Sequence, residues 1–324
     1  MSDGASSPAS SPANSAMRRS GAVRALRVAA HMARILLGLI LVAAGALKGL
    51  DPAEFAHQIA GYGIIGTAVS NLSAPLLIAF EFTVGLSLIV GFRPRASTLT
   101  AIALLVAFIG IDAYGIAQGR TEACGCFGAY VQRTPQQVIL EDLLFIGFGL
   151  LSLFGLRTWA GARGRGGVIA AVAVFAGGLL MLGFAIASPS LPLDPLVTSL
   201  AVGQGVEDLG LADIVPDLLE GRHLVALIDV TDEKTFETSA RLDEIAAMSG
   251  GPAVIALTPA TEEERLAFTW TATPSYDLRN VDRPVLKRLY RRLPRFFLVD
   301  RGHVQAVIDS AVPGPEDLVL SGPL

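Results

Sequence analysis

Five long apolar runs in the first 190 residues constrain this chain more than any other feature. They cover roughly residues 29–47, 74–92, 99–117, 138–156 and 168–187. Each run approaches the ~20 residues that an α-helix needs to cross the hydrocarbon core of a bilayer. A soluble globule of this size could bury one such helix but not five. The pattern therefore predicts five membrane spans.

Composition agrees with a membrane protein and excludes several other classes. Hydrophobic residues make up 52% of the chain and charged residues 17%, whereas soluble domains have about 25% charged residues. No basic stretch is interleaved with aromatics, so we expect no nucleic-acid partner. The 2 cysteines are too few for a disulfide-rich scaffold and too few for a closed structural zinc site. Membrane lipid is the expected surrounding, and no metal site is predicted.

The orientation of the spans follows from the basic residues beside them. Residues 1–28 are rich in Ser, Ala and Pro, and we expect them to form a disordered tail. A signal peptide is the alternative, but the polar stretch before the first apolar run is long for one. Ten Lys or Arg residues flank the ends on the side of the N-terminus, against three on the other side. Because basic residues favour the cytoplasm, we expect a multi-pass protein of the bacterial inner membrane with a cytoplasmic N-terminus. Everything after the fifth run then lies outside the cytoplasm.

Polar residues within the apolar runs are candidate functional residues. Glu81 stands in the middle of the second run, in "LIAFEFTVGL". A carboxylate is costly in hydrocarbon, so it should face the bundle interior and be protonated or paired. Two interpretations stay open: a helix–helix hydrogen bond, and a proton relay or quinone contact. Asp112, Glu141 and Asp142 are expected to be solvated or interfacial helix ends.

Both cysteines lie in one connection, in "ACGCFGAY", between the third and fourth runs. On the assigned side of the membrane disulfides persist. A bridge between Cys124 and Cys126 would close a small, strained ring, and strained disulfides are readily reduced. Gly125 allows the dihedrals that the ring needs. The sequence therefore predicts a redox-exchange pair, with a static loop bridge or two inert thiols as alternatives. A metal site that borrows His57 would lack a third and a fourth ligand.

The membrane half resembles MauE-type proteins, a branch of the DoxX-like membrane family. The likeness rests on "GLILVAAGALKGLDPAEFAHQIAGYGII", "FEFTVGLSLIVGFRPRAS" and "CGCFG", and covers roughly residues 33–156. The resemblance implies a four-helix membrane bundle. It also implies a role in methylamine utilisation, supporting disulfide formation or export of a periplasmic dehydrogenase subunit. The fifth span lies outside it.

The C-terminal part is predicted to be a small α/β domain after a stiff exit, "SPSLPLDP". "HLVALIDV" and "PAVIALTP" are apolar strands, and "LPRFFLVDRGHVQAVID" is a hairpin around an Asp-Arg-Gly turn. Helical spacing covers residues 236–248, Thr261 and Glu264 form a capping box, and a basic helix is expected to end at "YRR". Together they predict a mixed sheet with flanking helices.

This order is similar to the thioredoxin fold over about residues 200–310. The likeness rests on "ARLDEIAAM" and on "LPRFFLVDRGHV", and makes Pro294 the counterpart of the family's cis-proline. The family's Cys-x-x-Cys would fall on Asp232, Glu233, Lys234 and Thr235, of which none is a cysteine. We therefore expect this domain to keep the shape without the disulfide chemistry.

These observations predict a mainly α membrane bundle followed by an α/β thioredoxin-like domain. The expected boundaries are 1–28 for the tail, 29–160 for the bundle, 161–195 for the fifth helix and linker, and 196–324 for the periplasmic domain. The expected function is accessory: Cys124 and Cys126 assist thiol–disulfide maturation of an exported client or exchange with a periplasmic redox partner, with a quinone as the candidate cofactor. The alternatives are a non-enzymatic scaffold and a small transporter in which Lys48 and Glu81 mark a path.

Overall fold

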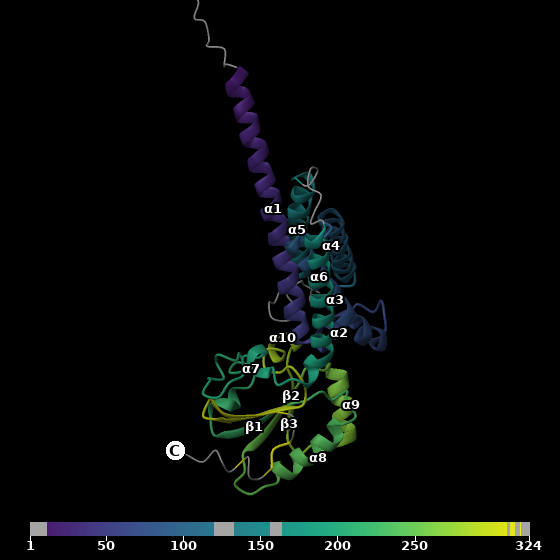
Figure 1. Cartoon of the computed structure of the whole chain (residues 1–324). Helices are drawn as coiled ribbons and strands as arrows, with labels where there is room; N and C mark the ends of the chain where they lie inside the picture. Colours follow the sequence, from purple (N-terminus) through teal and green to yellow (C-terminus); the bar gives the residue numbers. More distant parts are fainter. Residues whose placement is uncertain (1–11, 120–132, 156–163, 310–311, 315–317, 319–324) are drawn as a thin grey trace, which may run out of the picture. The chain divides into compact units, whose positions relative to one another are not determined.

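The structure is a computed structural model, and it describes residues 12–119, 133–155, 164–309, 312–314 and 318. The chain divides into two compact units, Met1–Ser190 and Leu191–Leu324. We call the first the membrane unit and the second the sheet unit. Figure 1 shows the helices of the membrane unit and the strands of the sheet unit.

The membrane unit consists of helices. They are α1 (Pro12–Leu50), α2 (Pro52–Gly61), α3 (Thr67–Val90), α4 (Pro94–Ala117), α5 (Pro135–Gly155) and α6 (Arg165–Ala187), followed by a 3₁₀ turn at Ser188–Ser190. Among the described residues, five helices are long and apolar enough to cross a membrane: α1 from residue 23 onward, α3, α4, α5, and α6 with its 3₁₀ turn. The prediction of five membrane-spanning helices is confirmed at this level.

The first helix begins earlier than expected. α1 starts at Pro12, so residues 12–28 are helical rather than a disordered tail. Proline suits the first turn of a helix, where its missing N–H is not needed. The residues that follow are mostly Ala, Arg, Met and Ser, and Ala, Arg and Met favour helix. The helix of the first apolar run can therefore extend backwards through them.

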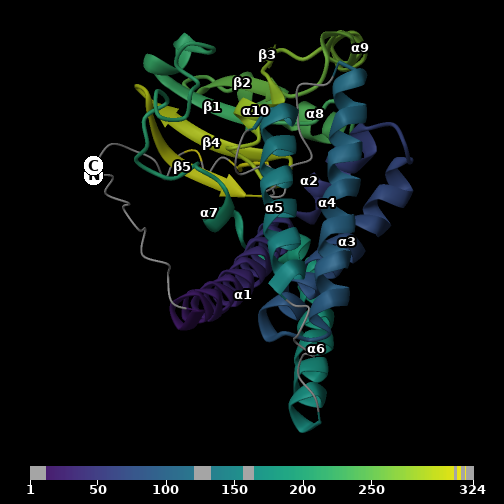
Figure 2. The same cartoon turned by 90° about the horizontal axis from the view of Figure 1, so that it is seen from above.

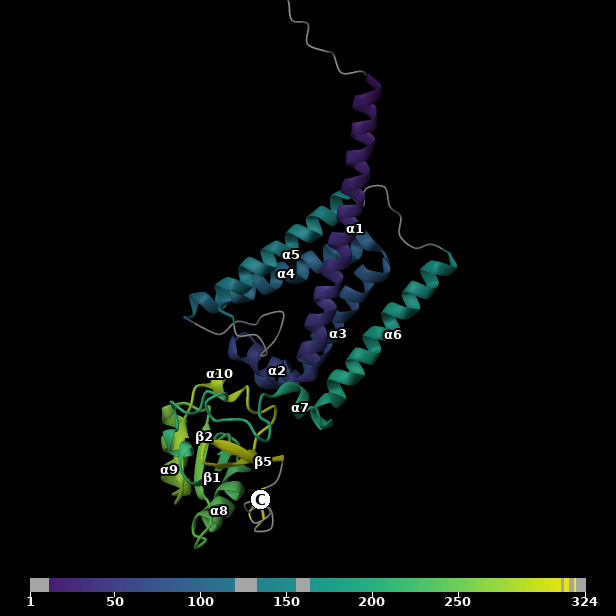
Figure 3. The same ribbon diagram turned by 90° about the vertical axis from the view of Figure 1, so that its left-hand side faces the viewer.

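Helix α3 is the centre of the membrane unit, packed against α1, α2, α4 and α6 (Figure 3). It approaches α1 most closely at two glycines. A Cβ placed on Gly38 would lie 2.8 Å from the carbonyl oxygen of Gly85, and one on Gly85 would lie 2.7 Å from that of Gly38. Small residues let membrane helices pack at this separation, where van der Waals contact is the main attraction.

The fifth span is part of the same bundle. A Cβ on Gly178 of α6 would lie 2.3 Å from the Thr83 hydroxyl of α3, and Met181 of α6 is buried in a cluster with Ile78. At the end of α6 the Ser188 hydroxyl donates to the carbonyl oxygen of Leu50, at 2.9 Å. The bundle therefore has one more helix than the four that the resemblance implies.

The sheet unit holds a five-stranded mixed sheet in the order β3-β2-β1-β4-β5 (Figure 2). Its elements in chain order are α7 (Asp194–Val197), a 3₁₀ turn at Pro216–Leu219, β1 (Arg222–Leu227), α8 (Thr235–Ala246), β2 (Ala253–Thr258), α9 (Glu262–Ala272), β3 (Asp277–Asn280), α10 (Arg283–Leu286), β4 (Arg295–Asp300) and β5 (His303–Asp309). β1, β2 and β3 are parallel, whereas β4 runs antiparallel to β1 and β5 antiparallel to β4. This confirms the expected mixed sheet with helices.

Alternation along the strands divides the core of this unit into two layers. Val225 and Phe297 face one layer, which the segment before β1 and α10 cover. Leu224 and Phe296 face the other, where α8 and α9 supply Leu242 and other apolar side chains. Sheet and helices thus bury apolar side chains on both faces.

The expected basic helix is much shorter in the structure. α10 is a helix of 4 residues, Arg283–Leu286, and the following residues up to β4 are turns. The arginines there explain the difference, because Arg291 and Arg295 turn inward to bind carbonyl oxygens. Regular helical spacing would place such side chains along one outer face.

Candidate functional site

The central feature of the membrane unit is an ion pair between Lys48 and Glu81. Lys48 lies in the last turn of α1, and Glu81 lies in the middle of α3. The Nζ and Oε2 atoms are 2.7 Å apart, and both side chains are 0% exposed. Of the two states expected for Glu81, protonated or paired, the structure has the paired one. Pairing lowers the large cost of placing either charge in a bundle without water.

Two aromatic rings complete the surroundings of the ammonium group. Lys48 Nζ lies 5.0 Å from the ring centroid of Phe55 on α2 and 4.9 Å from that of Phe108 on α4. At these distances a ring face attracts a cation. The ion pair is therefore enclosed by side chains from α1, α2, α3 and α4.

A second buried polar pair lies one helical turn further along α4. The Tyr62 hydroxyl donates to Asp112 Oδ1 at 2.7 Å, and Asp112 is 1% exposed. Phe108 and Asp112 are four residues apart, so they lie on the same face of α4. Phe55 and Tyr62 likewise come from α2 and the turn that ends it. We call Lys48, Glu81, Tyr62 and Asp112 the polar cluster.

The prediction that Asp112 and Asp142 are solvated or interfacial is wrong. Both are 1% exposed, and the helices that carry them, α4 and α5, pack against each other. The third such residue, Glu141, is partly exposed and forms an ion pair with Arg133. Position near a helix end therefore did not indicate exposure in this bundle.

The connection that carries the cysteines leaves the bundle at the end where the polar cluster lies. α4 ends at Ala117 and α5 begins at Pro135, and Asp112 lies five residues before the end of α4. Cys124 and Cys126 themselves lie outside the described residues. α1 ends, and α3 begins, at this same end of the bundle, because consecutive spans alternate in direction. Lys48, Tyr62 and Asp112 therefore lie towards the end of the bundle from which the cysteine connection leaves, and Glu81 meets Lys48 from the middle of α3.

Glu81 Oε1 is a buried acceptor with no hydrogen-bond donor among the described residues. It is inaccessible to solvent, whereas Oε2 is taken by Lys48. A second oxygen of this kind is a place for a proton or for a hydroxyl donor. No group of three His, Cys, Asp or Glu side chains in the described residues is placed to hold a metal ion.

Sequence reasoning named Lys48 with Glu81 only as the path of a small transporter, an alternative function, and did not predict that the two form a buried ion pair. It placed Lys48 in an outer connection, and it did not single out Tyr62. A signal for Lys48 was present: it is the one lysine among residues 1–190 and falls at the end of an apolar run. Such a residue needs an opposite charge, and Glu81 is the acid nearest the centre of a span.

In the sheet unit, the four positions on which the resemblance would place a thioredoxin motif lie in a turn with its own hydrogen bonds. The backbone N–H of Lys234 donates to Asp232 Oδ1 at 3.0 Å, and the Thr235 hydroxyl donates to the carbonyl oxygen of Asp229 at 2.5 Å. Asp232 and Lys234 are exposed, and Thr235 is buried at the start of α8. These contacts position the helix and supply no nucleophile. The Leu293–Pro294 peptide bond, which precedes β4, is cis.

Among the groups of the sheet unit with shifted pKa values are His223, Tyr276 and Asp217. Burial lowers the pKa of His223, an effect that Asp217 opposes and Arg279 reinforces. Burial raises the pKa of Tyr276, whose hydroxyl lies 2.8 Å from Ser239 Oγ. Hydrogen bonds from the Arg279 guanidinium lower the pKa of Asp217. The sheet unit itself contains no cysteine, and these groups are considered below as contributors to stability.

Comparison with known proteins places one part of the chain. Residues 26–160 match the family of the methylamine utilisation protein MauE. The methylamine utilization protein MauE of Paracoccus denitrificans is 29% identical over 125 residues, which cover 38% of this chain and 67% of the relative. No solved structure matches. The membrane unit is therefore similar to MauE from within α1 to the end of α5, and the matched range spans the four residues of the polar cluster and both cysteines.

Proposed function

We propose that this chain is a multi-pass membrane accessory protein of the MauE type that supports thiol–disulfide maturation of exported proteins through Cys124 and Cys126. The pathway, methylamine utilisation, is taken from the name of the relative. The observation that carries the proposal is the buried polar cluster, of which Lys48, Tyr62 and Asp112 lie towards the end of the bundle from which the cysteine connection leaves. Buried polar groups of this kind in a membrane bundle are costly and mark function.

The chemistry is an exchange between the Cys124–Cys126 disulfide and a client with two thiols. A client thiolate attacks one of the two sulfurs, which forms a mixed disulfide and releases the other cysteine as a thiolate. The second client thiolate then attacks the client sulfur of the mixed disulfide, which releases the cysteine that was bound to the client. The client leaves with a disulfide, and Cys124 and Cys126 remain as two thiols.

The pair must then lose two electrons and two protons to become a disulfide again. We propose a lipid-soluble quinone as the acceptor, which becomes a quinol. The open acceptor Glu81 Oε1 supports this role, because it suits a released proton or a quinol O–H. An acceptor oxygen does not suit a quinone carbonyl, which needs a donor. Glu81 is thus proposed to take part on the product side of the reaction.

We further propose that the sheet unit has a thioredoxin-like fold and binds the client. The arrangement that supports this is a parallel pair, β1 and β2, with the antiparallel hairpin β4–β5 on the other side of β1. The cis peptide bond before Pro294 stands at the start of β4, where the resemblance puts it. Because the chain has no cysteine at 232–235, this unit would hold a client without exchanging disulfides with it.

Single-cysteine variants test the proposal directly. Cys126→Ser should trap a client or a small thiol on Cys124, or Cys124→Ser should trap one on Cys126, because the resolving thiol is gone. Non-reducing gels of both variants, with the double variant as control, measure the adduct. The outcome that refutes the redox role is no adduct with either variant together with normal maturation by the double variant. The pair would then be a structural bridge in a scaffold.

Orientation is tested separately with a membrane-impermeant thiol reagent after mild reduction. We expect Cys124 and Cys126 to be labelled in intact cells, since ten basic residues flank the opposite ends of the spans. A second site, a cysteine introduced at the exposed Lys234, reports the side of the sheet unit. If both sites are labelled only after the cells are opened, both lie in the cytoplasm and the proposed orientation is wrong.

A further inference from the structure

The sheet unit has an uneven distribution of charge. Residues 191–324 contain 12 Lys and Arg against 21 Asp and Glu. Six of the 12 cations fall within residues 283–295, "RPVLKRLYRRLPR", which contain no acid. We call this the basic segment. An acidic unit with one basic segment has one surface that an anionic partner would favour.

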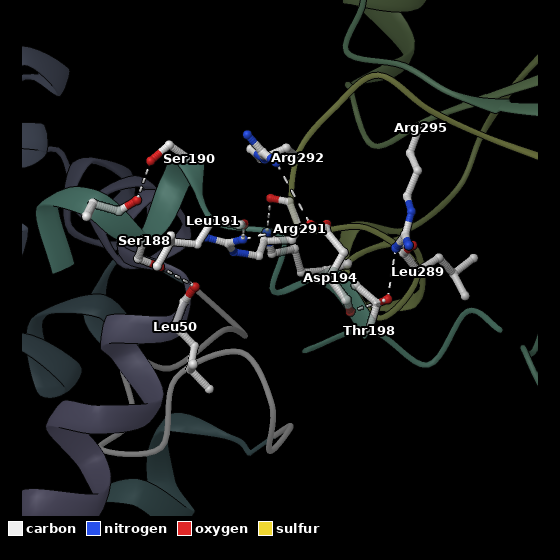
Figure 4. A network of polar contacts seen from close by, with 12 residues as sticks. Leu50, Ser188, Ser190, Leu191, Asp194, Thr198, Leu289, Arg291, Arg292 and Arg295 are labelled. Carbon is white, nitrogen blue, oxygen red and sulfur yellow. Dashed lines mark hydrogen bonds and ion pairs between the residues drawn. The ribbon is translucent and has the colours of Figure 1, made fainter. Parts of the chain in front are cut away.

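Buried arginines tie this segment to the residues that leave the membrane. Arg291 Nη1 donates to the carbonyl oxygen of Leu191 at 2.9 Å, and Arg295 Nη1 donates to the Thr198 hydroxyl at 2.8 Å (Figure 4). Leu191 directly follows Ser190, the last residue of the fifth membrane-spanning helix. The backbone N–H of Ser199 also donates to the carbonyl oxygen of Arg288, at 2.8 Å.

Covalent geometry then limits how far the exposed cations can lie from the bilayer. Arg292 Nη2 is 3.9 Å from Asp194 Oδ2, and the Arg292 side chain is 49% exposed. Asp194 is four residues beyond Ser190, a separation of at most about 14 Å for extended chain. The headgroup layer extends about 5–8 Å beyond the hydrocarbon. Arg292, and Arg288 one turn before it in the sequence, are therefore held within reach of lipid phosphates.

We propose that the basic segment, through the exposed Arg288 and Arg292, binds the phosphate of anionic phospholipid headgroups and so fixes which face of the sheet unit meets the membrane. Guanidinium groups bind phosphate oxygens through two parallel hydrogen bonds. The remaining acidic surface would be repelled by the same lipids. This site is independent of the cysteine chemistry and would operate in a scaffold as well.

Lipid retention by the full-length protein tests the inference. The protein is purified in detergent with equal amounts of phosphatidylglycerol and phosphatidylcholine, and bound lipids are counted by native mass spectrometry. Arg288→Gln/Arg292→Gln should lower the preference for phosphatidylglycerol about 20-fold at low salt, from about 1 kcal/mol for each cation at an anionic surface. The matched control Lys234→Gln/Arg241→Gln removes two exposed cations elsewhere in the unit and should keep the preference.

Two outcomes would overturn the proposal. The first is an unchanged preference in Arg288→Gln/Arg292→Gln. The second is an equal loss in the control, which would mean that net charge matters and position does not. Melting of both variants by circular dichroism checks that neither is misfolded; a charge-reversed pair, Arg288→Glu/Arg292→Glu, should reject phosphatidylglycerol altogether if the site is correct. Inorganic phosphate added at millimolar concentration should compete only weakly with phosphatidylglycerol, since the site is proposed to bind headgroups of lipids in a membrane surface.

Discussion

The two units of this protein bury positive charge in different ways. In the membrane unit, Lys48 is paired with a carboxylate and enclosed by two phenyl rings. In the sheet unit, Arg291 and Arg295 are 4% and 3% exposed. Among the described residues they donate to backbone carbonyls and a hydroxyl, and Arg291 also forms a longer ion pair with Asp194, at 3.8 Å.

The difference follows from the chemistry of the two cations. A guanidinium has five donors in a planar fork and can satisfy several carbonyl oxygens at once, whereas an ammonium is a compact point charge. In a bundle without water, a compact charge needs an opposite charge close by. The membrane unit therefore depends on a matched pair, and the sheet unit on distributed hydrogen bonds.

Packing differs between the units as well. The contact between α1 and α3 depends on glycines whose absent side chains let two backbones meet. The sheet unit instead fills two layers with Val, Leu, Ile and Phe. Lipid offers no hydrophobic drive for helices to associate, so close approach replaces burial from water as the source of stability.

The largest effect is expected from breaking the ion pair on one side. Glu81→Leu leaves the Lys48 ammonium buried without its counter-charge, which should cost about 3–5 kcal/mol. The measurement is thermal unfolding of the purified protein in detergent. The matched variant Lys48→Met/Glu81→Leu removes both charges and should unfold close to the unmodified protein. Equal destabilisation by the single and the double change would mean that the two charges are not coupled.

The double variant also separates a structural role from a functional one. If the pair only holds helices together, the stable Lys48→Met/Glu81→Leu protein should mature its client normally. Our proposal predicts a loss of re-oxidation, seen as accumulation of reduced Cys124 and Cys126. Unimpaired turnover would leave Glu81 as a packing residue.

A smaller effect is expected from removing an arginine of the sheet unit. Arg291→Met loses hydrogen bonds made by a charged donor, which are typically worth about 1.5–3 kcal/mol. Urea unfolding is followed by the fluorescence of Trp270, with Trp159→Phe as the background. Arg291→Lys keeps the charge but lacks the planar guanidinium with its several donors, so it should recover only part of the lost stability. Full recovery by lysine would show that charge alone matters, contrary to the distributed bonding described above.

The glycine contact gives the third effect. Gly38→Ala should destabilise the bundle by about 1–3 kcal/mol, the usual range for overpacking. Gly110→Ala on α4 is the control, because a Cβ there would meet nothing within 4 Å. That control should be neutral or slightly stabilising, since alanine favours helix over glycine. Melting curves in detergent compare the stability of the two variants. Equal stability of Gly38→Ala and Gly110→Ala would show that α1 and α3 can move apart without cost.

The smallest effect concerns pH and is confined to the sheet unit. Because burial lowers the pKa of His223, the folded state binds its proton less readily than the unfolded state does. Stability from this group is therefore present above the unfolded value of about 6.5 and is lost as pH falls through it towards the folded value. Urea midpoints at pH 7.5 and 5.5 should differ less in His223→Gln than in the unmodified chain. An identical pH response would assign the effect to other groups.

Local sequence patterns predicted the helices and strands better than they predicted which residues contact one another. Apolar runs of about 20 residues indicated the spans, and the Asp-Arg-Gly turn within "LPRFFLVDRGHVQAVID" indicated a hairpin of two strands. The cost of a carboxylate in hydrocarbon indicated that Glu81 would be paired or protonated. It did not identify Lys48, 33 residues away, because the pairing depends on how α1 and α3 cross. The burial of Asp112 and Asp142 also depends on neighbouring helices, and sequence position alone gave the wrong answer.

The sheet shows the same limit. The strands around "HLVAL" and "AVIAL" were evident, but the edge position of β3 (Asp277–Asn280) was not. Four residues carry too little pattern, and Arg279 and Asp277 make an exposed ion pair there. The basic helix was overpredicted because helical propensity does not foresee that Arg291 and Arg295 bind carbonyls inside the unit. Long-range contacts decided each of these points.

The contact between Gly38 and Gly85 restricts how this protein can change over evolutionary time. A Cβ on either glycine would meet the other's main-chain oxygen first, with side-chain atoms of Ile89 and Leu88 or of Leu41 only slightly further away. A larger residue at one position therefore cannot be accommodated by a smaller residue at the other, because glycine is already the smallest residue. Most packed pairs can exchange volume in two compensating steps, but this pair has no such route. Lineages that keep the α1–α3 crossing should keep both glycines, and a lineage that loses one should have moved the helices apart.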